Sequence, residues 1–502
     1  MNLNIKTFPH QKTLNGILLL IVVISLLLRF VNLDADFPFG ITRSGVLYTD
    51  EGWYANAAVR HYVSGNWYLA GDFNPAINMP LGQILHRFTF SIFGLDLLSV
   101  RTTTVVFFVF LVAVTAWLVH RSFGSFAALL TALLLVTNYL GFAFSRLALM
   151  ELMATFFVVS GLLAAGDLKK EEWRLARLLL ASVLIGAGAL TKSTMVFAVP
   201  LLGYLAWRQG RSYQERLTFL FASVTVTLCV IEGYQIVARA LFPEDSAYFA
   251  QLNLYSRVHE SFAYWLVKIP RMIVRIEVLG ISFIAPTVLT TSIALIISER
   301  YRKHPLVHIL IGYTAFYIAL ISLVSYGPPR YYLPLIVSSA ALCATSCLEL
   351  REWLYKTQWS RFSIVPILPL IMVFGISLTG SGKIMSYLSV PSYSFLQMAR
   401  EVGSIIEERE GKVSKVVLFG HIADSVAIEI GTLSVNTRLG TRTLNWKLKK
   451  YHPQYLLLHT DEEVLEAVKS EGGLVVELAS WDVYDNYYGK GQQVKLMYVN
   501  WN

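Results

Sequence analysis

Charged residues are scarce in this chain. Asp, Glu, Lys and Arg make up only 15% of its 502 residues, whereas 55% are hydrophobic. Soluble proteins carry about 25% charged residues, so the composition argues against a soluble globular protein. It predicts a chain that crosses a membrane many times.

Cysteine is equally rare. The three cysteines are Cys229, Cys343 and Cys347, all inside apolar segments. Cys343 and Cys347 are four residues apart and share a helix face, but no His or carboxylate cluster accompanies them. We interpret them as small buried hydrophobes, and no disulfide framework is implied. The chain also lacks an internal repeat and a low-complexity tract.

Long apolar runs dominate the first 380 residues. A membrane-spanning helix needs about 20 apolar residues. Eleven apolar segments are candidate spans, at about 16–33, 98–120, 123–139, 149–165, 174–190, 194–207, 217–239, 276–298, 306–325, 331–349 and 362–379. The shorter segment 81–93 contains His86 and Arg87, and it predicts an amphipathic helix lying at the membrane interface.

The net charge of +9 has a topological explanation. Basic chains can bind nucleic acid, but here the basic residues fall in short loops between apolar runs, which is the positive-inside pattern. An uncleaved first helix with a cytoplasmic N-terminus makes every internal loop basic, and one span more or fewer would place several clusters outside. These internal residues are Arg121, Lys169, Lys170, Arg174, Arg177, Arg208, Arg211, Arg216, Arg300, Arg302, Lys303, Arg351, Lys356 and Arg361. We therefore expect a multi-pass protein of the inner or plasma membrane.

The last part of the chain has a different character. Residues 1–390 form the expected membrane domain, with a first outer loop at about 34–97, and residues 391–502 form an extracytoplasmic domain. Short apolar runs at 416–419 and 455–458 predict strands, and 398–410, 424–431 and 462–470 predict helices. This alternation predicts a small α/β domain. The Gly- and Ser-rich segment 380–393 is the expected linker.

The first outer loop carries an adjacent carboxylate pair, Asp50 and Glu51, followed by Trp53 and Tyr54. Carboxylates next to a membrane span are costly unless water, a partner or a substrate uses them. A carboxylate can act as a general base toward an acceptor hydroxyl, and it can also bind a divalent cation. The simpler interpretation is a solvated pair at a helix start.

Three further outer segments carry cations. Arg146 with Glu151 suits either a phosphate site or an interfacial anchor, and the sequence does not separate these. Lys192 sits at an outer turn where the positive-inside pattern disfavours a cation, so an anionic ligand is the better explanation. Arg330 and Tyr331 follow a rigid Pro-Pro turn. Together these cations predict a pocket for a lipid phosphate at headgroup depth.

Other outer-face residues give weaker indications. The segment 240–275 reads as a mobile lid or surface loop without a recognisable site, although it contains Glu244, Asp245, Arg257, His259 and Glu260. His421 reads as structural. A sugar-stacking surface and ordinary core packing are both open for Trp481, Tyr484, Tyr487 and Tyr488.

These motifs resemble those of a known family. Asp50-Glu51, the segment Ser145–Glu151, Leu-Thr-Lys-Ser around Lys192 and Arg-Tyr-x-Leu-Pro from Arg330 resemble the integral-membrane GT-C glycosyltransferases. Among them, the protein O-mannosyltransferase-like enzymes, which include the aminoarabinose transferase of lipid A, are the most similar. The resemblance covers about residues 15–350. The chain departs from that pattern at Trp53, where those transferases have arginine, and at Asn78-Met79, so it names neither sugar nor acceptor.

The resemblance implies inverting transfer of a sugar from a polyprenyl-phosphate donor to a lipid, glycan or protein acceptor outside the membrane. It makes Asp50 the base with Glu51 in support. Lys192 would meet the carrier phosphate, and the remaining substrate-binding residues would be Tyr54, Arg146, Glu151, Arg330 and Tyr331. The resemblance establishes no cofactor, and a divalent metal ion stays open. A transporter or flippase of a lipid-linked or small solute is the alternative, which predicts mid-membrane charges and repeat symmetry. A membrane anchor for the C-terminal domain would leave the loop carboxylates unexplained.

Overall fold

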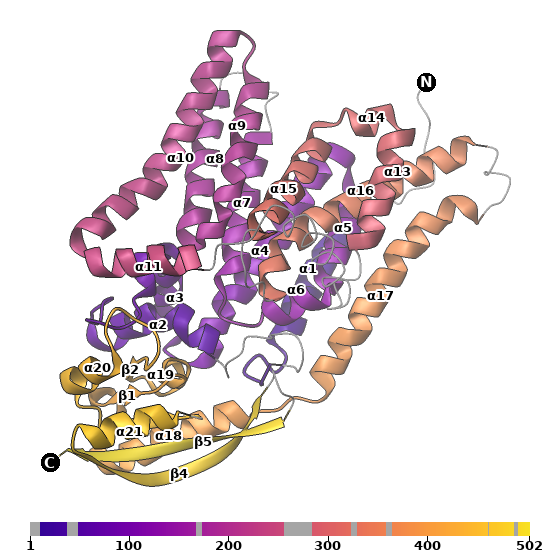
Figure 1. The fold of residues 1–502 in the computed structure, drawn as a ribbon. Helices are drawn as coiled ribbons and strands as arrows, with labels where there is room; N and C mark the ends of the chain where they lie inside the picture. Colours follow the sequence, from indigo (N-terminus) through magenta and orange to yellow (C-terminus); the bar gives the residue numbers. More distant parts are fainter. Residues whose placement is uncertain are drawn as a thin grey trace.

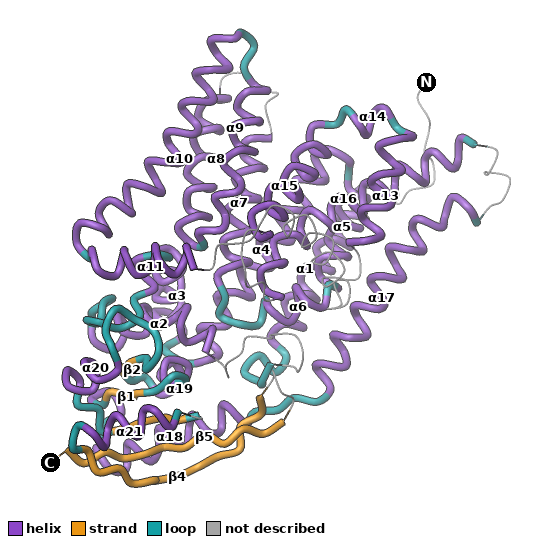
Figure 2. Tube along the Cα trace, in the orientation of Figure 1, coloured by secondary structure: helices purple, strands orange, loops and turns teal. Residues whose placement is uncertain are grey.

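A computed structural model describes residues 11–37, 49–166, 173–255, 284–322, 329–357, 364–459, 461–485 and 490–501. These residues form a bundle of apolar helices and a smaller C-terminal part that contains all the described strands (Figure 2). The expected fold class, a polytopic helical membrane protein with a C-terminal α/β unit, is confirmed.

The helices of the bundle and its outer segments follow in chain order. They are α1 Gln11–Phe30, α2 Thr49–Ser64, η1 Pro75–Ile77, α3 Pro80–Phe93, α4 Leu97–Phe123, α5 Ser125–Thr137, α6 Tyr139–Phe144, α7 Met150–Gly166, α8 Arg174–Thr191, η3 Ser193–Phe197, α9 Ala198–Gln209, α10 Tyr213–Leu241, α11 Pro243–Tyr255, α13 Ile284–Ile297, α14 Glu299–Arg302, α15 Pro305–Ser322, η4 Pro329–Tyr332, α16 Leu333–Lys356, η6 Val365–Ile367 and α17 Leu368–Ser389.

Seven helices in the described ranges are long and apolar enough to cross a membrane, and α5, α7 and α13 are shorter apolar helices. The most apolar window of α16 is 94% buried, whereas those of α1 and α10 are only 17% buried. A helix that is apolar all round and exposed must face lipid, so α1 and α10 lie at the edge of the bundle and α16 at its centre. The expected span 194–207 is divided between η3 and the 12-residue α9.

Two expected loops are helical. The linker prediction for 380–393 is wrong up to Ser389, because α17 continues to that residue. Gly380 packs against α5, where a Cβ would come within 2.0 Å of the Thr137 carbonyl oxygen. This glycine therefore serves close helix packing, as small residues commonly do in membranes. The prediction of a loop at 240–275 is wrong for 243–255, which form α11; residues 256–283 lie outside the described residues.

The C-terminal part is built on one five-stranded sheet. Its elements are α18 Ser394–Glu410, η7 Val413–Lys415, β1 Val417–Phe419, α19 Ala423–Ile430, β2 Leu433–Val435, α20 Leu444–Tyr451, β3 Tyr455–Leu458, α21 Glu462–Ser470, β4 Gly473–Asp485 and β5 Lys490–Trp501. The strand order is β2-β1-β3-β5-β4. β1 is parallel to β2 and β3, whereas β5 runs antiparallel to β3 and β4.

Helices α2, α3 and α11 lie between the bundle and the C-terminal part (Figure 1). One hydrophobic cluster joins α2 to the C-terminal part, because Ala55, Ala58 and Val59 are buried with Ala423 and Val426. The two parts thus share a core, and α2 is in contact with both.

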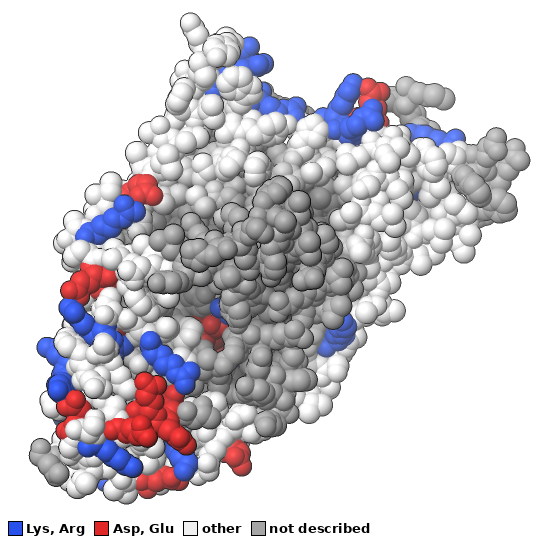
Figure 3. Space-filling model, in the orientation of Figure 1, with Lys and Arg blue, Asp and Glu red and all other residues white. Residues whose placement is uncertain are grey.

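Charge is distributed unevenly along the molecule. On the face drawn in Figure 3, Lys and Arg gather at the end of the bundle remote from the C-terminal part, few charges lie on the described residues of the bundle, and both signs are mixed on the C-terminal part. A nearly uncharged band between two charged ends is what a bilayer requires. The protein is a multi-pass membrane protein.

Candidate active site

The first turn of α2 carries Thr49, Asp50 and Glu51. Carboxylates are stabilised at a helix N-terminus by the helix dipole, which explains why the helix begins here. Because successive helix residues point in different directions, the two carboxylates diverge. Asp50 lines a cavity of about 330 Å³, and Glu51 points into the protein.

This cavity lies where the bundle meets the outer segments. Five of the expected site residues come from α2, the α8–η3 junction and η4. Apolar side chains from α11, α15 and the C-terminal part complete the lining, which comprises Asp50, Trp53, Tyr54, Lys192, Arg330 and Tyr331 with Phe73, Asn78, Met79, Ser193, Thr194, Val196, Phe249, Leu252, Leu320 and Leu439.

Two carboxylates and two cations meet at the base of the cavity. Arg330 forms an ion pair with Asp50, and its Nε lies 3.6 Å from Glu151 Oε1. Lys192 Nζ lies 3.2 Å from the same Glu151 oxygen. Glu151 therefore bridges both cations, while its own side chain is fully buried.

Two tyrosines hold Lys192 in place. Its ammonium donates a hydrogen bond to the Tyr54 hydroxyl and lies 4.3 Å from the centre of the Tyr54 ring and 5.6 Å from that of Tyr331. Burial alone would lower the pKa of Lys192, but Glu151 and both tyrosines raise it above its usual range. Lys192 is thus a fixed positive charge. Its backbone is extended at the end of α8, which lets the side chain leave the helix axis.

Glu51 is held by Arg101 of α4. The guanidinium Nε and Nη2 lie 2.9 and 2.7 Å from the two Glu51 oxygens, and the Ala148 backbone N–H donates to Oε1 at 3.0 Å. Arg101 also donates to the backbone oxygens of Leu33 and Ala35. The Glu51–Arg101 pair fixes the first turn of α2 against α4 and against the segment that follows α1. Sequence reasoning missed Arg101, although an arginine one turn inside a span is itself a signal of a buried partner.

Arg146 lies away from the cavity base. Its guanidinium donates to the backbone oxygens of Arg29 and Val31 at 2.9 and 2.7 Å, and also to that of Asn32. The Arg29 carbonyl is in the last turn of α1, where carbonyls have no partner within the helix, and Val31 and Asn32 directly follow the helix. Arg146 therefore caps the end of α1 from inside the protein, where it is 1% exposed, a contact that neither the interfacial anchor nor the phosphate site described. The expected contribution to substrate binding has no contact in the described residues that supports it.

The C-terminal part presses directly on α2. Gly52 N donates to Ser425 Oγ at 3.2 Å, and Asn56 Nδ2 donates to Asp424 Oδ1 at 2.9 Å. A Cβ on Gly52 would come within 2.4 Å of the Ser425 nitrogen, so only glycine permits this approach. Burial raises the pKa of Asp424 to about 6.

A second group of charged side chains links the outer loop to the C-terminal part. Asp72 is fully buried and pairs with Arg60, and its Oδ1 lies 2.9 Å from Lys447 Nζ. On α11, Asp245 accepts hydrogen bonds from Asn74 at 2.8 Å and from Tyr68 at 3.1 Å. Segments distant in sequence thereby close one side of the cavity.

His421 packs beside the cavity. Its ring lies 5.4 Å from that of Trp53 in an edge-on arrangement, and it is buried. Burial lowers the pKa of His421 to about 4, so the ring is neutral at physiological pH. This agrees with a structural role for His421.

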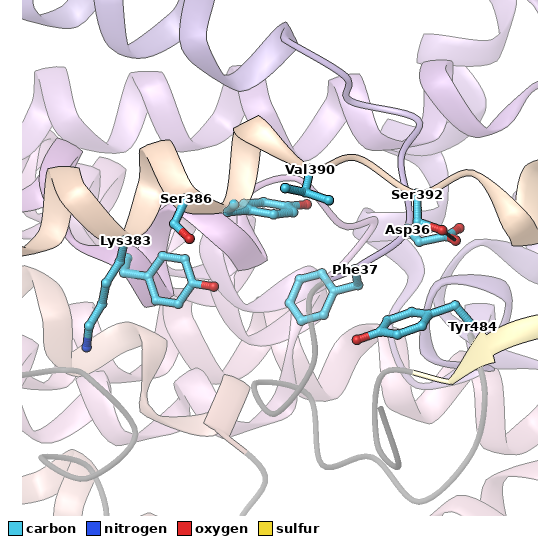
Figure 4. Close-up of a pocket in the computed structure, with 9 residues that line it drawn as sticks. Asp36, Phe37, Lys383, Ser386, Val390, Ser392 and Tyr484 are labelled. Carbon is cyan, nitrogen blue, oxygen red and sulfur yellow. Dashed lines mark hydrogen bonds between the residues drawn. The ribbon is translucent and has the colours of Figure 1, made fainter. Parts of the chain in front are cut away.

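A separate cavity of about 550 Å³ lies between α17 and the C-terminal part. Figure 4 shows Lys383 and Ser386 from α17 on one side, with Phe37 and Tyr484 facing each other farther along. Of the residues considered for sugar stacking, Tyr484 lines this cavity, whereas Trp481 Nε1 donates to Glu401 at 2.6 Å. Tyr487 and Tyr488 lie outside the described residues.

Across the described residues, no three His, Cys, Asp or Glu side chains are grouped as metal ligands would be. At the base of the main cavity the carboxylates face cations instead. The side chains at the base of this cavity suit an anionic ligand better than a divalent cation.

Comparison with known proteins adds to this geometry. The profile of the dolichyl-phosphate-mannose-protein mannosyltransferase family matches residues 75–234. The crystal structure of ArnT from Cupriavidus metallidurans bound to undecaprenyl phosphate is similar over 96% of this chain and 98% of its own, with a TM-score of 0.64 at 15% identity. The chain has the GT-C glycosyltransferase fold.

A more distant structure shares this GT-C fold. The Archaeoglobus fulgidus oligosaccharyltransferase, in complex with Zn and sulfate, has a TM-score of 0.53 at 12% identity, covering 91% of this chain and 72% of its own. Comparison with curated protein sequences finds no match. The expected resemblance to GT-C transferases is confirmed.

Proposed function

We propose that this protein transfers a sugar from a polyprenyl-phosphate donor to an acceptor hydroxyl, with inversion at the anomeric carbon. The observation that carries the proposal is the cavity in which the Asp50 carboxylate meets the two buried cations Lys192 and Arg330. The profile of a mannosyltransferase family and a similar structure with undecaprenyl phosphate support the same class of reaction.

The two cations are the proposed phosphate site. Lys192 and Arg330 are 7% and 8% exposed, so both have lost most of their hydration and gain strongly from an anionic partner. Without donor, Asp50 and Glu151 neutralise them. A donor phosphate would take over Arg330 and release the Asp50 carboxylate toward the acceptor.

The proposed reaction then has three parts: proton transfer, bond cleavage and stabilisation of the leaving phosphate. Asp50 accepts the proton of the acceptor hydroxyl as its oxygen bonds to the anomeric carbon. The bond between that carbon and the phosphate oxygen breaks, and the oxygen leaves with the electron pair. Lys192 and Arg330 stabilise the charge that develops on the phosphate. Attack from the face opposite the phosphate gives inversion.

The environment of the cavity also favours a lipid-linked donor. It lies beside the apolar bundle, on the same side as the C-terminal part, and Phe249, Leu252 and Leu320 line it. These apolar side chains would accommodate part of the prenyl chain next to its phosphate. We propose that this side is extracytoplasmic, because Lys and Arg gather at the opposite end.

The first experiment identifies the donor. Mass spectrometry of lipid that co-purifies with the protein should find a polyprenyl phosphate, with or without its sugar. Purified protein in vesicles containing that lipid should then transfer the sugar to an acceptor, and Asp50→Asn should reduce turnover by about 100-fold or more.

As controls, the thermal stability and the amount of bound lipid are measured for Asp50→Asn and for the wild type, and both should be equal. Full turnover in Asp50→Asn would refute Asp50 as the base. Solute flux across the vesicles without sugar transfer would refute the transferase and favour the transporter.

A further inference from the structure

A further cavity, of about 200 Å³, lies among α1, α5, α6 and α17. It shares no described lining residue with the 330 Å³ cavity that Asp50 lines or with the 550 Å³ cavity beside Tyr484. The most apolar windows of α1 and of the segment that contains α17 are only 17% and 22% buried, and Figure 1 shows α17 along one edge of the bundle. Two walls of the cavity therefore belong to helices that face lipid.

Arg29, the second-last residue of α1, lines this cavity and is only 1% exposed. Its Nε donates to Ser145 Oγ at 2.8 Å, and its Nη1 donates to the Ser25 backbone oxygen at 3.0 Å. In the described part of the chain, Nη2 has no hydrogen-bond partner and no carboxylate forms an ion pair with Arg29. These residues therefore leave a buried guanidinium without a counter-charge and with one nitrogen unpaired.

The surroundings of Arg29 add a second cation and two aromatic rings. Arg146 donates to the Arg29 backbone oxygen at 2.9 Å. Within the described residues, Asp34, whose charge also acts on Arg146, forms an ion pair with neither arginine. The centres of the Phe108 and Phe142 rings lie 4.1 and 5.0 Å from Arg29 Cζ. Aromatic rings offset part of the cost of burying a cation, but an anionic oxygen would supply both the missing charge and the missing acceptor.

From Arg29 the cavity extends along α1 toward the interior of the bundle. Its lining on this helix runs from Ile21 to Arg29, a rise of about 12 Å at 1.5 Å per residue. Apolar side chains from α5 and α17, including Leu133 and Ile384, form the facing walls. A cation at the end of a membrane helix, with an apolar passage leading inward from it, matches an amphiphile whose headgroup is anionic.

The position of Arg29 decides which leaflet would supply this amphiphile. The carbonyls of Leu33 and Ala35, which follow α1, accept hydrogen bonds from Arg101, the partner of Glu51 at the start of α2. Arg29 therefore lies at the end of the bundle that carries the candidate active site.

We propose that this cavity binds an anionic phospholipid from the leaflet on the active-site side. A phosphate oxygen of the headgroup accepts hydrogen bonds from Arg29 Nη2, and part of one acyl chain lies among α1, α5 and α17. A free phosphate would use Arg29 but not the apolar walls. A bound water would supply an acceptor but no charge.

Native mass spectrometry of the full-length protein in neutral detergent tests the proposal. Phosphatidylglycerol, which carries a net negative charge, should bind more tightly than zwitterionic phosphatidylcholine. Arg29→Gln should weaken phosphatidylglycerol binding by about tenfold or more, because it removes hydrogen bonds between two charged groups. Arg29→Gln also changes the contact with Ser145, so a second variant leaves Arg29 in place. Ser381→Phe narrows the cavity from α17 and should weaken the same binding.

Each variant has a matched control. Leu378→Phe enlarges a side chain that lies one turn earlier on α17, is 76% exposed and does not line the cavity. Arg239→Gln removes one charge from the last turn of α10, which also lies outside the lining. Both controls should bind phosphatidylglycerol like the wild type.

Unchanged binding in Arg29→Gln or in Ser381→Phe would overturn the proposal, as would equal weakening in a variant and its control. Equal binding of phosphatidylglycerol and phosphatidylcholine would exclude recognition of an anionic headgroup. Displacement of phosphatidylglycerol by millimolar inorganic phosphate would assign Arg29 to a free anion and overturn the lipid assignment.

Discussion

Lys192 is surrounded by groups that stabilise its positive charge. Glu151, Tyr54 and Tyr331 all contact its ammonium, and the side chain has almost no access to water. Such a charge is costly to bury without a use. Its place beside Arg330 supports the proposed contact with the donor phosphate.

Replacing Lys192 tests that role. Lys192→Met should raise the KM for the lipid donor and lower kcat, since the cation would act on both the bound phosphate and the leaving group. Lys192→Arg should retain part of both. Donor titrations in vesicles measure the split, and unchanged kinetics in Lys192→Met would contradict a phosphate contact.

Glu51 contributes through Arg101 and not through the cavity. Glu51→Gln should cost about 3–5 kcal/mol of stability, because it removes the carboxylate that is paired with the buried guanidinium of Arg101. Thermal unfolding in detergent measures the loss. Adding Arg101→Met should restore much of the stability, and a double variant no more stable than Glu51→Gln would contradict this account.

At the scale of residues, the sequence predicted which charged side chains matter, but not which residues they contact. The sequence indicated that Glu51 and Arg146 mattered, because charges next to spans are costly. It did not reveal that Arg101 holds Glu51 or that Arg146 caps α1, since these partners are 50 and 117 residues away in sequence. Lys192 and Arg330 were predicted to lie together, and they do so through Glu151.

At the scale of elements, α2 is positioned by the C-terminal part. The closest approach is at Gly52, directly after the two carboxylates. A shift of α2 by a fraction of an ångström would move Asp50 relative to Arg330. Catalytic geometry is sensitive to displacements of this size.

Gly52→Ala should therefore lower turnover strongly while costing only about 1–3 kcal/mol of stability, the usual range for overpacking. Gly233→Ala on α10 is the control, because a Cβ there meets no atom within 4 Å. Sugar transfer and thermal unfolding are measured together. Normal turnover in Gly52→Ala would show that α2 does not depend on this contact.

The folded protein should become less stable in acid, because His421 is buried as the neutral ring. The pKa of His421 is about 4 in the folded protein and about 6.5 unfolded, so the unfolded state takes up the proton first as pH falls. The contribution of neutral His421 to the free energy of unfolding is fully present above pH 6.5 and is lost toward pH 4. At pH 5 about 2 kcal/mol of it is lost.

His421→Phe should make thermal unfolding less dependent on pH between 7 and 5, because it removes this proton uptake. Asp424 acts in the opposite direction, since its raised pKa favours the folded state at low pH. An equal loss of stability in wild type and His421→Phe would exclude His421 as the source.

Elements were predictable where hydropathy decides them. All eleven expected spans overlap described helices, because a long apolar run in a membrane has few alternatives to a helix. The errors occurred where local signals mislead. Gly380 looked like a break but allows close packing, and polar α11 looked like a loop because its partners lie elsewhere in the chain. β4 and β5 were missed because their pairing is with each other and with β3.

For the whole molecule, charge predicts orientation. The C-terminal part should face outside the cytoplasm, and the basic end should face the cytoplasm. In a variant without native cysteines, Lys469→Cys on α21 should react with a membrane-impermeant maleimide in intact cells, and Lys303→Cys at the basic end should react only after the membrane is opened. The reverse pattern would invert the proposed topology.

The capping of α1 by Arg146 has a consequence for synthesis. Arg146 binds the carbonyl of Arg29 in the last turn of the first helix and those of Val31 and Asn32 just after it, but this guanidinium is encoded 117 residues later than Arg29. At about 5–20 residues per second, the ribosome needs roughly 6–23 s to supply it. During that interval these carbonyls must bind water or the insertion machinery. We therefore expect the end of the first helix to reach its final packing only when α7 begins to emerge.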